Sequence, residues 1–307
     1  MNGLELSRAF YEQHGKNMLE SQFPALLPLL AIGFVGNGSE KSGFDDAVSA
    51  DHDYEAGFCI FLPGEELVSR RDAFLLERAY AKLPREFMEV TRPILSPVGG
   101  NRVGPIRTAE FYEKAVGTPD GRLSMEQWLR IPDYALYDAT NGQVFSDPFG
   151  EFSRIRENLL RMPGDIRLKR LAGQLLLMAQ SGPYNYVRCL AHSEPEAAQL
   201  AKAEFVRAAM QCLFLLKKCY MPYYKWSFRA LRAIPGMEEE TAILSQILLS
   251  CDDCRESVNT FCRLISSRVR ALFPALPATD DPEPLAYAVN GLIKDSEIRN
   301  LHILYAV

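Results

Sequence analysis

The stretch that decides the fold is Pro28–Glu55, which reads PLLAIGFVGNGSEKSGFDDAVSADHDYE. Its first eight residues, Pro28–Val35, form an almost unbroken apolar run that ends in a glycine turn. Such a run predicts a buried strand that feeds the turn. A second strand is expected immediately downstream, over Tyr54–Leu62 (YEAGFCIFL). The polar segment between these two strands therefore connects buried parts of a sheet, where functional residues are often found.

This connecting segment contains Gly38-Ser39 and, after eleven intervening residues, the acidic pair Asp51 and Asp53. Residues two apart in a strand point to the same face, so the two carboxylates can lie side by side. Paired carboxylates repel unless a cation lies between them, and their oxygens suit Mg²⁺. A Gly-Ser turn offers N–H groups and a hydroxyl to phosphate oxygens. Together these residues indicate metal-assisted phosphoryl or nucleotidyl transfer, although an Asp-x-Asp pair alone is usually a solvated loop.

Length and composition favour two globular domains. The chain has 307 residues, of which 48% are hydrophobic and 24% charged, and domains average about 150 residues. Residues 1–150 carry 14 Lys and Arg against 22 Asp and Glu, whereas residues 151–307 carry 20 against 17. The first part mixes short apolar runs with turns, and the second has apolar residues at helical spacing. We therefore expect an α/β (α+β) domain over 1–150 and an all-α bundle over 151–307.

The expected elements follow from the same patterns. Asn141-Gly142 is the strongest hairpin signal, with Tyr134–Thr140 and Gln143–Phe145 as its strands and Asp147–Gly150 as the linker to the helical domain. Helices are expected over residues 4–22, 69–82, 152–161, 165–181, 195–219, 238–250, 257–273 and 282–294.

Several features favour a cytoplasmic protein. The seven cysteines have irregular spacing, which is typical of reduced intracellular thiols. The longest apolar run, Phe23–Val35, has 13 residues and two prolines, too few and too broken to span a membrane. The net charge of −5 disfavours nucleic acid as the default partner without excluding it.

The order strand, Gly-Ser, eleven residues, Asp-x-Asp, strand resembles the signature of the DNA polymerase beta-like nucleotidyltransferase superfamily, which includes the aminoglycoside nucleotidyltransferases. A closer resemblance is to an uncharacterised bacterial nucleotidyltransferase-like domain family of unknown function. It is carried by GNGSE, GFDDAVSADHD, DPFGEFSRIR, SGPYNYVRC and MPYYKW, between Gly36 and Trp226. The resemblance implies a nucleotidyltransferase fold with a mixed sheet, followed by a helical domain that contributes to the substrate cleft.

The resemblance also implies roles for residues of the connecting segment. Gly38 and Ser39 would hold the triphosphate of a nucleotide, with ATP as the expected donor. Asp51 and Asp53 would bind the catalytic Mg²⁺.

A third carboxylate acts as general base in this superfamily. Asp138, expected on the strand before Asn141-Gly142, is the first candidate, and Glu110 and Asp133 are alternatives. If none of them reaches the metal, the base would have to come from the helical domain.

The segment Met221–Arg229 (MPYYKWSFR) offers a cation and aromatic rings. In the functional interpretation Lys225 reaches the triphosphate and an aromatic ring stacks on the base. The alternative is an aromatic-rich helix that packs on the first domain and leaves Lys225 solvated.

The expected reaction is therefore transfer of a nucleoside monophosphate from a triphosphate to an acceptor hydroxyl. By analogy the acceptor is a small, aminoglycoside-like molecule. The alternatives are transfer to a protein or an RNA end, or a non-catalytic nucleotide-binding or interaction module.

Overall fold

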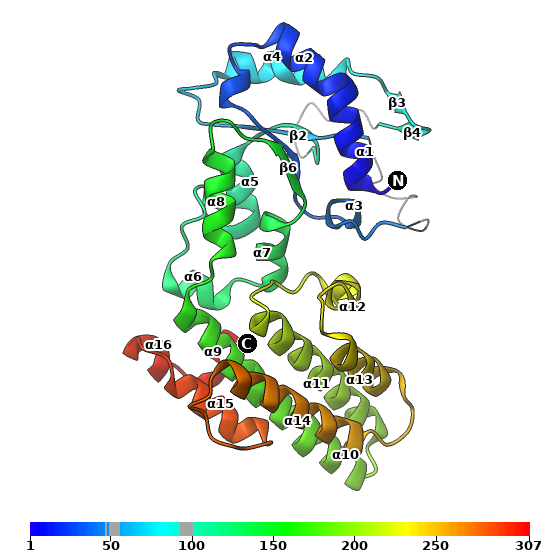
Figure 1. Cartoon of the computed structure of the whole chain (residues 1–307), viewed down its shortest axis with the longest axis vertical. Helices are drawn as coiled ribbons and strands as arrows, with labels where there is room; N and C mark the ends of the chain where they lie inside the picture. Colours follow the sequence, from blue (N-terminus) through cyan, green and yellow to red (C-terminus); the bar gives the residue numbers. More distant parts are fainter. Residues whose placement is uncertain (47, 49–55, 93–100) are drawn as a thin grey trace. The chain divides into compact units, whose positions relative to one another are not determined.

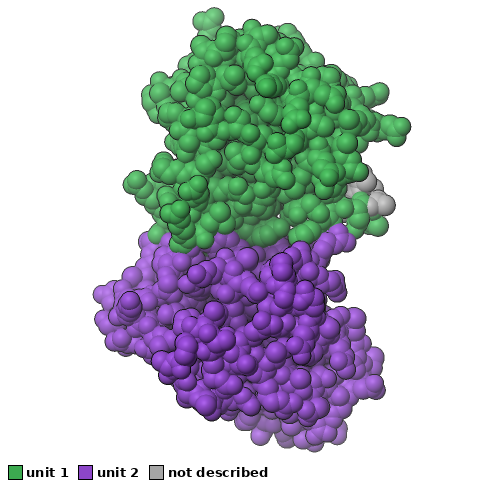
Figure 2. All heavy atoms as spheres, in the orientation of Figure 1, with its two compact units in different colours: residues 1–123, 135–161 green, residues 124–134, 162–307 purple. Residues whose placement is uncertain are grey.

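The chain forms two compact units (Figures 1 and 2). The computed structural model describes residues 1–46, 48, 56–92 and 101–307. The first unit comprises residues 1–123 and 135–161, and the second comprises residues 124–134 and 162–307. The first unit contains a mixed sheet and the second is helical, so the predicted fold class is confirmed. Residues 151–161, expected at the start of the helical domain, pack with the first unit.

The sheet of the first unit has four strands in the order β5-β2-β1-β6. Strand β1 pairs antiparallel with both β2 and β6, and β2 pairs parallel with β5. All residues of β1 and β2 are buried, which explains why both were visible as continuous apolar runs. The bounds are β1 Ala31–Phe34, β2 Cys59–Leu62, β5 Gly104–Arg107 and β6 Gln143–Ser146, and a separate hairpin joins β3 Glu86–Phe87 to β4 Val90–Thr91.

Helices cover both faces of this sheet (Figure 1). Ile60 and Leu62 of β2 belong to one apolar core with residues of α1, α2 and α4. Phe61 points the other way, because successive strand residues alternate between faces. Its ring centre lies 3.9 Å from that of Phe152 in α8 and 5.2 Å from that of Phe111 in α5. The helix bounds are α1 Gly3–Phe10, α2 Lys16–Gln22, α4 Arg70–Ala81, α5 Thr108–Val116 and α8 Glu151–Leu160.

The predicted hairpin around Asn141-Gly142 is wrong. The residues before it form helix α7, Asp133–Thr140, and only β6 after it is a strand. Leu136 and Ala139 are both fully buried, and this spacing of three is the period of a helix face. The glycine of the pair does mark a turn: Gly142 has φ +67°, and a Cβ there would lie 2.0 Å from the carbonyl oxygen of Phe34. The turn therefore joins a helix to β6 close against β1.

The first predicted helix, over residues 4–22, is present as α1 and α2 joined by a π-helical segment, Tyr11–Gly15. Helix α4 begins where expected, because the Ser69 side chain accepts a hydrogen bond from the N–H of Asp72 and caps it. The remaining short helices before the second unit's main bundle are α3 Ser39–Ser42 and α6 Met125–Arg130.

The second unit is built around α9, which packs against α11 and α15. Lys169 of α9 is fully buried, and its Nζ donates to Asn290 Oδ1 at 2.9 Å and to the Leu301 carbonyl at 2.6 Å. The helices predicted in this region are present. Their bounds are α9 Gly164–Ala179, α10 Val187–Ala191, α11 Pro195–Leu216, α12 Tyr224–Arg232, α13 Glu238–Leu249, α14 Arg255–Leu272, α15 Pro282–Gly291 and α16 Ser296–Asn300.

A π-helical segment, Gln180–Tyr186, joins α9 to α10, and a 3₁₀ turn, Ile303–Ala306, closes the unit. In the described part of the chain, no helix has the combination of length and apolar character that a membrane crossing requires.

Candidate functional site

The turn between β1 and α3 carries the predicted phosphate-binding residues Gly38 and Ser39. Gly36 and Gly38 have φ angles of +119° and +125°, a backbone conformation that residues with a Cβ rarely adopt. Gly38 occupies the N-cap position of α3 and has no side chain to cap it. Among the described residues, none accepts a hydrogen bond from the N–H of Gly38 or Ser39. Such N–H groups at the start of a helix suit an anionic oxygen.

Asn141 fixes the start of this turn. Its Oδ1 accepts a hydrogen bond from the N–H of Gly36 at 2.9 Å, and its Nδ2 donates to the Gly36 carbonyl at 2.7 Å. Nδ2 also lies 3.4 Å from Ser42 Oγ. One buried side chain therefore satisfies both backbone groups of Gly36 and ties α3 to the segment before β6.

Lys41 places a positive charge directly behind the turn. Its side chain comes from α3, and only 3% of the residue surface is exposed. Nζ donates to the Arg102 carbonyl at 3.2 Å and lies 5.2 Å from the centre of the Phe34 ring. A Cβ placed on Gly36 would be 3.4 Å from Nζ, so the ammonium group lies against the turn itself.

Arg102 supplies a second cation at the turn. Its Nη2 forms an ion pair with the buried Glu40 carboxylate and donates to the Asn37 carbonyl at 3.0 Å. A Cβ at Gly38 would lie 2.4 Å from both the guanidinium and the carboxylate. The turn is therefore closed by an ion pair that only glycine accommodates at this position.

Asp138, the first candidate for the general base, lies in α7 and not on a strand as predicted. Burial raises its pKa to about 6, and the positive charge of Lys41 partly offsets this rise. The neighbouring Tyr137 has a pKa raised by burial and lowered in part by a hydrogen bond with Ser42. The Tyr137–Ser42 hydrogen bond links α7 to α3. A carboxylate with a pKa near neutrality is suited to accepting a proton at physiological pH.

The predicted metal ligands Asp51 and Asp53 lie outside the described residues. Within the described ranges, no three His, Cys, Asp or Glu side chains are grouped as a metal site. The assignment of Mg²⁺ to Asp51 and Asp53 stays a prediction.

Glu110 and Asp133, the two alternatives to Asp138 as general base, differ from it in burial and in their interactions. Glu110 is exposed in the first turn of α5. Asp133 is buried in the second unit, where Oδ1 lies 3.0 Å from Arg170 Nη2 and Oδ2 accepts a hydrogen bond from the N–H of Met221 at 3.4 Å. Burial raises the pKa of Asp133, although the Arg170 charge opposes the rise. Asp138 is thus the candidate that interacts with a residue of α3.

Lys225 lies in the second unit, exposed in the first turn of α12. Its Nζ is 5.0 Å from the centre of the Trp226 ring, and the Arg229 guanidinium is 4.9 Å from the same ring. Tyr224–Arg229 of this segment lie in α12, and Met221–Tyr223 precede the helix. A role for Lys225 toward a nucleotide remains untested.

Sequence reasoning missed Lys41, Arg102 and Asn141. Lys41 follows Ser39 by two residues, but nothing in the local sequence distinguishes a buried lysine from a solvated one. Arg102 approaches the turn from the segment before β5, a contact between residues more than sixty positions apart. The sequence indicated Asn141 only as part of the Asn141-Gly142 turn, whereas its side chain bonds to Gly36 in the β1–α3 turn.

Comparison with protein families adds one finding. Residues 128–227 match the family model described as "Domain of unknown function (DUF4037)". No curated protein and no solved structure matches the chain. The matched segment runs from α6 to α12 and includes Asp133, Asp138 and Lys225. It includes Asn141, whose side chain bonds to Gly36, but it does not include the β1–α3 turn itself.

Proposed function

We propose that the protein is a Mg²⁺-dependent nucleotidyltransferase that moves a nucleoside monophosphate from a triphosphate, with ATP as the expected donor, to an acceptor hydroxyl. The observation that carries the proposal is the β1–α3 turn. It combines two glycines of positive φ, the N–H groups of Gly38 and Ser39, and the buried charge of Lys41. An aminoglycoside-like acceptor rests on family analogy alone.

The electrostatics of the turn support a phosphate ligand. A triphosphate carries about four negative charges, which require nearby cations or N–H dipoles. Lys41 and Arg102 place two cations at the turn, where Arg102 pairs with Glu40. The Lys41 ammonium group is buried behind the glycines, where a low local dielectric strengthens its interaction with a phosphate.

Asp51 and Asp53 would hold the Mg²⁺, whose charge when bound would offset that of the phosphates and polarise the α-phosphate. The donor set fits this ion, because carboxylate oxygens are hard ligands that Mg²⁺ prefers. In the described ranges no His and Cys cluster competes as a site for a softer metal.

Asp138 would act as the general base. Its carboxylate would take the proton of the acceptor hydroxyl as the hydroxyl oxygen forms its bond to the α-phosphorus. The bond between the α-phosphorus and the bridging oxygen to the β-phosphate breaks, and pyrophosphate leaves. With a pKa of about 6, Asp138 is mostly ionised at pH 7 and can accept this proton.

The test is transfer of label from α-³²P-labelled ATP, GTP, CTP or UTP in the presence of Mg²⁺ and a panel of aminoglycosides. We expect labelled product and pyrophosphate with one nucleotide, and a loss of about 100-fold or more in Asp138→Asn. Asp252→Asn, at an exposed residue between α13 and α14, is the matched control and should keep full activity.

Other outcomes would redirect the proposal. Label on the protein itself or on an added RNA end would keep the chemistry and change the acceptor. Mg²⁺-dependent nucleotide binding without any transfer would favour a binding module. The proposed function would be refuted if the folded protein neither bound nor transferred any of the four nucleotides.

A further inference from the structure

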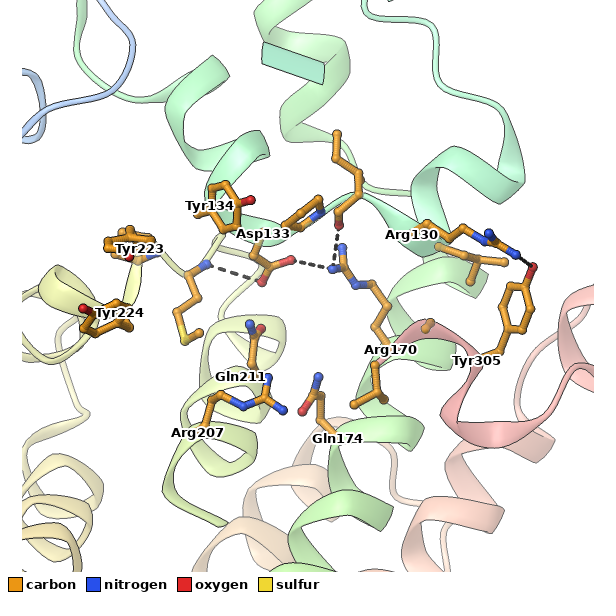
Figure 3. A pocket seen from close by; sticks show the side chains of 17 residues that line it. Arg130, Asp133, Tyr134, Arg170, Gln174, Arg207, Gln211, Tyr223, Tyr224 and Tyr305 are labelled. Carbon is orange, nitrogen blue, oxygen red and sulfur yellow. Dashed lines mark hydrogen bonds and ion pairs between the residues drawn. The ribbon is translucent and has the colours of Figure 1, made fainter. Parts of the chain in front are cut away.

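The second unit contains a pocket of about 440 Å³ (Figure 3). All of its lining residues belong to this unit. They come from the end of α6 and the start of α7, from α9 and α11, from the start of α12 with the segment before it, and from the C-terminal end of the chain. The volume falls within the range of small-molecule sites.

Two buried polar groups of α9 line this pocket with unused hydrogen-bonding atoms. Arg170 is 8% exposed and Gln174 is 6% exposed. Among the described residues, neither Arg170 Nη1 nor Gln174 Oε1 has a hydrogen-bond partner. The two residues are four positions apart and share one face of the helix. An unused donor and an unused acceptor therefore lie on the same wall, an arrangement that is costly unless a ligand satisfies it.

Arg170 is held in place by its other terminal nitrogen. Nη2 forms an ion pair with Asp133 Oδ1 at 3.0 Å and donates to the Ile131 carbonyl at 2.9 Å. Figure 3 shows both interactions at the pocket wall. Nη1 is thus a pre-oriented donor, because the guanidinium is rigid and already fixed on one side.

The cations of the pocket are compensated. Arg170 faces Asp133, Arg130 lies 3.2 Å from Glu126 Oε1, and Arg207 lies 2.7 Å from Glu204. A simple anion would also leave Gln174 Oε1 without a donor. The pocket therefore favours an uncharged ligand that both accepts and donates hydrogen bonds.

Three tyrosines add flat apolar surface at one side of the pocket (Figure 3). Tyr134, Tyr223 and Tyr224 are 46%, 53% and 74% exposed. The ring centres of Tyr134 and Tyr223 are 6.2 Å apart, and those of Tyr223 and Tyr224 are 4.5 Å apart. Clustered tyrosines of this exposure are suited to contact the face of a ring.

We propose that this pocket binds an uncharged small molecule with a ring that packs on the tyrosines. An acceptor and a donor on that ring would pair with Arg170 Nη1 and Gln174 Oε1. Nucleosides and pyranosides share this chemistry. The site lies within the second unit and is independent of the proposed reaction at the β1–α3 turn.

The test is calorimetric titration of the full chain with adenosine, guanosine, cytidine, uridine, methyl glucoside and N-acetylglucosamine. Binding of the nucleosides or of the sugars would support the site and would show which of the two classes of ligand it takes. In Gln174→Leu the affinity should fall about three- to tenfold, the loss expected for one neutral hydrogen bond. The melting temperature of the unliganded variant should stay the same or rise, because an unpaired buried acceptor is removed.

Gln199→Leu, the same change at an exposed residue of α11, should leave the affinity unchanged. The double variant Asp51→Asn, Asp53→Asn should bind the compound as the wild type does, which separates this site from the proposed function. The inference is overturned if no compound of either group binds. It is also overturned if Gln174→Leu binds as tightly as the wild type, or if binding is lost in the double variant.

Discussion

Replacing Asp138 by Asn should make the first unit more stable at neutral pH and less active. Burial raises the pKa of Asp138 from its ordinary value of 3.8 to about 6. The folded state therefore binds the proton more tightly than the unfolded state, and the associated stability is present at low pH and lost as pH rises from about 4 through 6. A difference of about two pKa units corresponds to about 3 kcal/mol at most. Since Asp138 is only partly buried, solvent screening reduces this to about 1–2 kcal/mol.

The assay is native-state hydrogen exchange of peptides that cover β1 and α7, measured at pH 4.5 and pH 8 in the wild type and in Asp138→Asn. Exchange reports each unit separately, whereas a single unfolding curve of a two-unit chain does not. Relative to the wild type, the free energy of unfolding of the first unit should be about 1–2 kcal/mol higher in the variant at pH 8, and the difference should be much smaller at pH 4.5. The reasoning would be refuted if the wild type and Asp138→Asn were equally stable at both values of pH, or if the variant were less stable than the wild type at pH 8. The control Asp252→Asn should not stabilise the first unit at either pH.

Three further predictions concern buried polar groups. Asn141→Ala leaves the N–H and carbonyl of Gly36 without their partner and should cost about 2–4 kcal/mol in the exchange of β1 amides; a cost below about 0.5 kcal/mol would contradict this role. Lys41→Met removes the charge that lowers the pKa of Asp138, so a carboxyl ¹³C titration should place that pKa above 6, and an unchanged value would show that the two groups do not interact. Lys169→Met strips donors from two buried acceptors and should destabilise the second unit by about 2 kcal/mol; tryptophan fluorescence during urea unfolding reports this, since both tryptophans lie in that unit, and a higher midpoint would contradict it.

The elements that could be predicted from sequence are those whose burial follows a simple period. Strands β1 and β2 are apolar throughout because helices cover both faces of the sheet. The long helices of the second unit repeat apolar residues at a spacing that fits only a helix. Gly36 and Gly38 were readable as a turn, and both adopt the positive φ that the pattern requires.

Helix α7 could not be recognised, because Tyr134–Thr140 is short and its apolar residues fit either period. The Asn-Gly pair then favoured a hairpin, whereas Asn141 bonds to Gly36 more than a hundred residues away. The buried charge of Lys41 could not be predicted either, because it also depends on contacts between residues far apart in the sequence. The burial of Lys41 depends on contacts with Phe34 and Arg102, which local sequence does not encode.

The most direct test of the central claim is calorimetric binding of the four nucleoside triphosphates with and without Mg²⁺, in the wild type and in the double variant Asp51→Asn, Asp53→Asn. The account predicts that one nucleotide binds the wild type only with Mg²⁺, and that the double variant binds it at least about tenfold more weakly, a loss of 1.4 kcal/mol or more. Absence of binding in the folded wild type, or equal binding by both proteins, would contradict it.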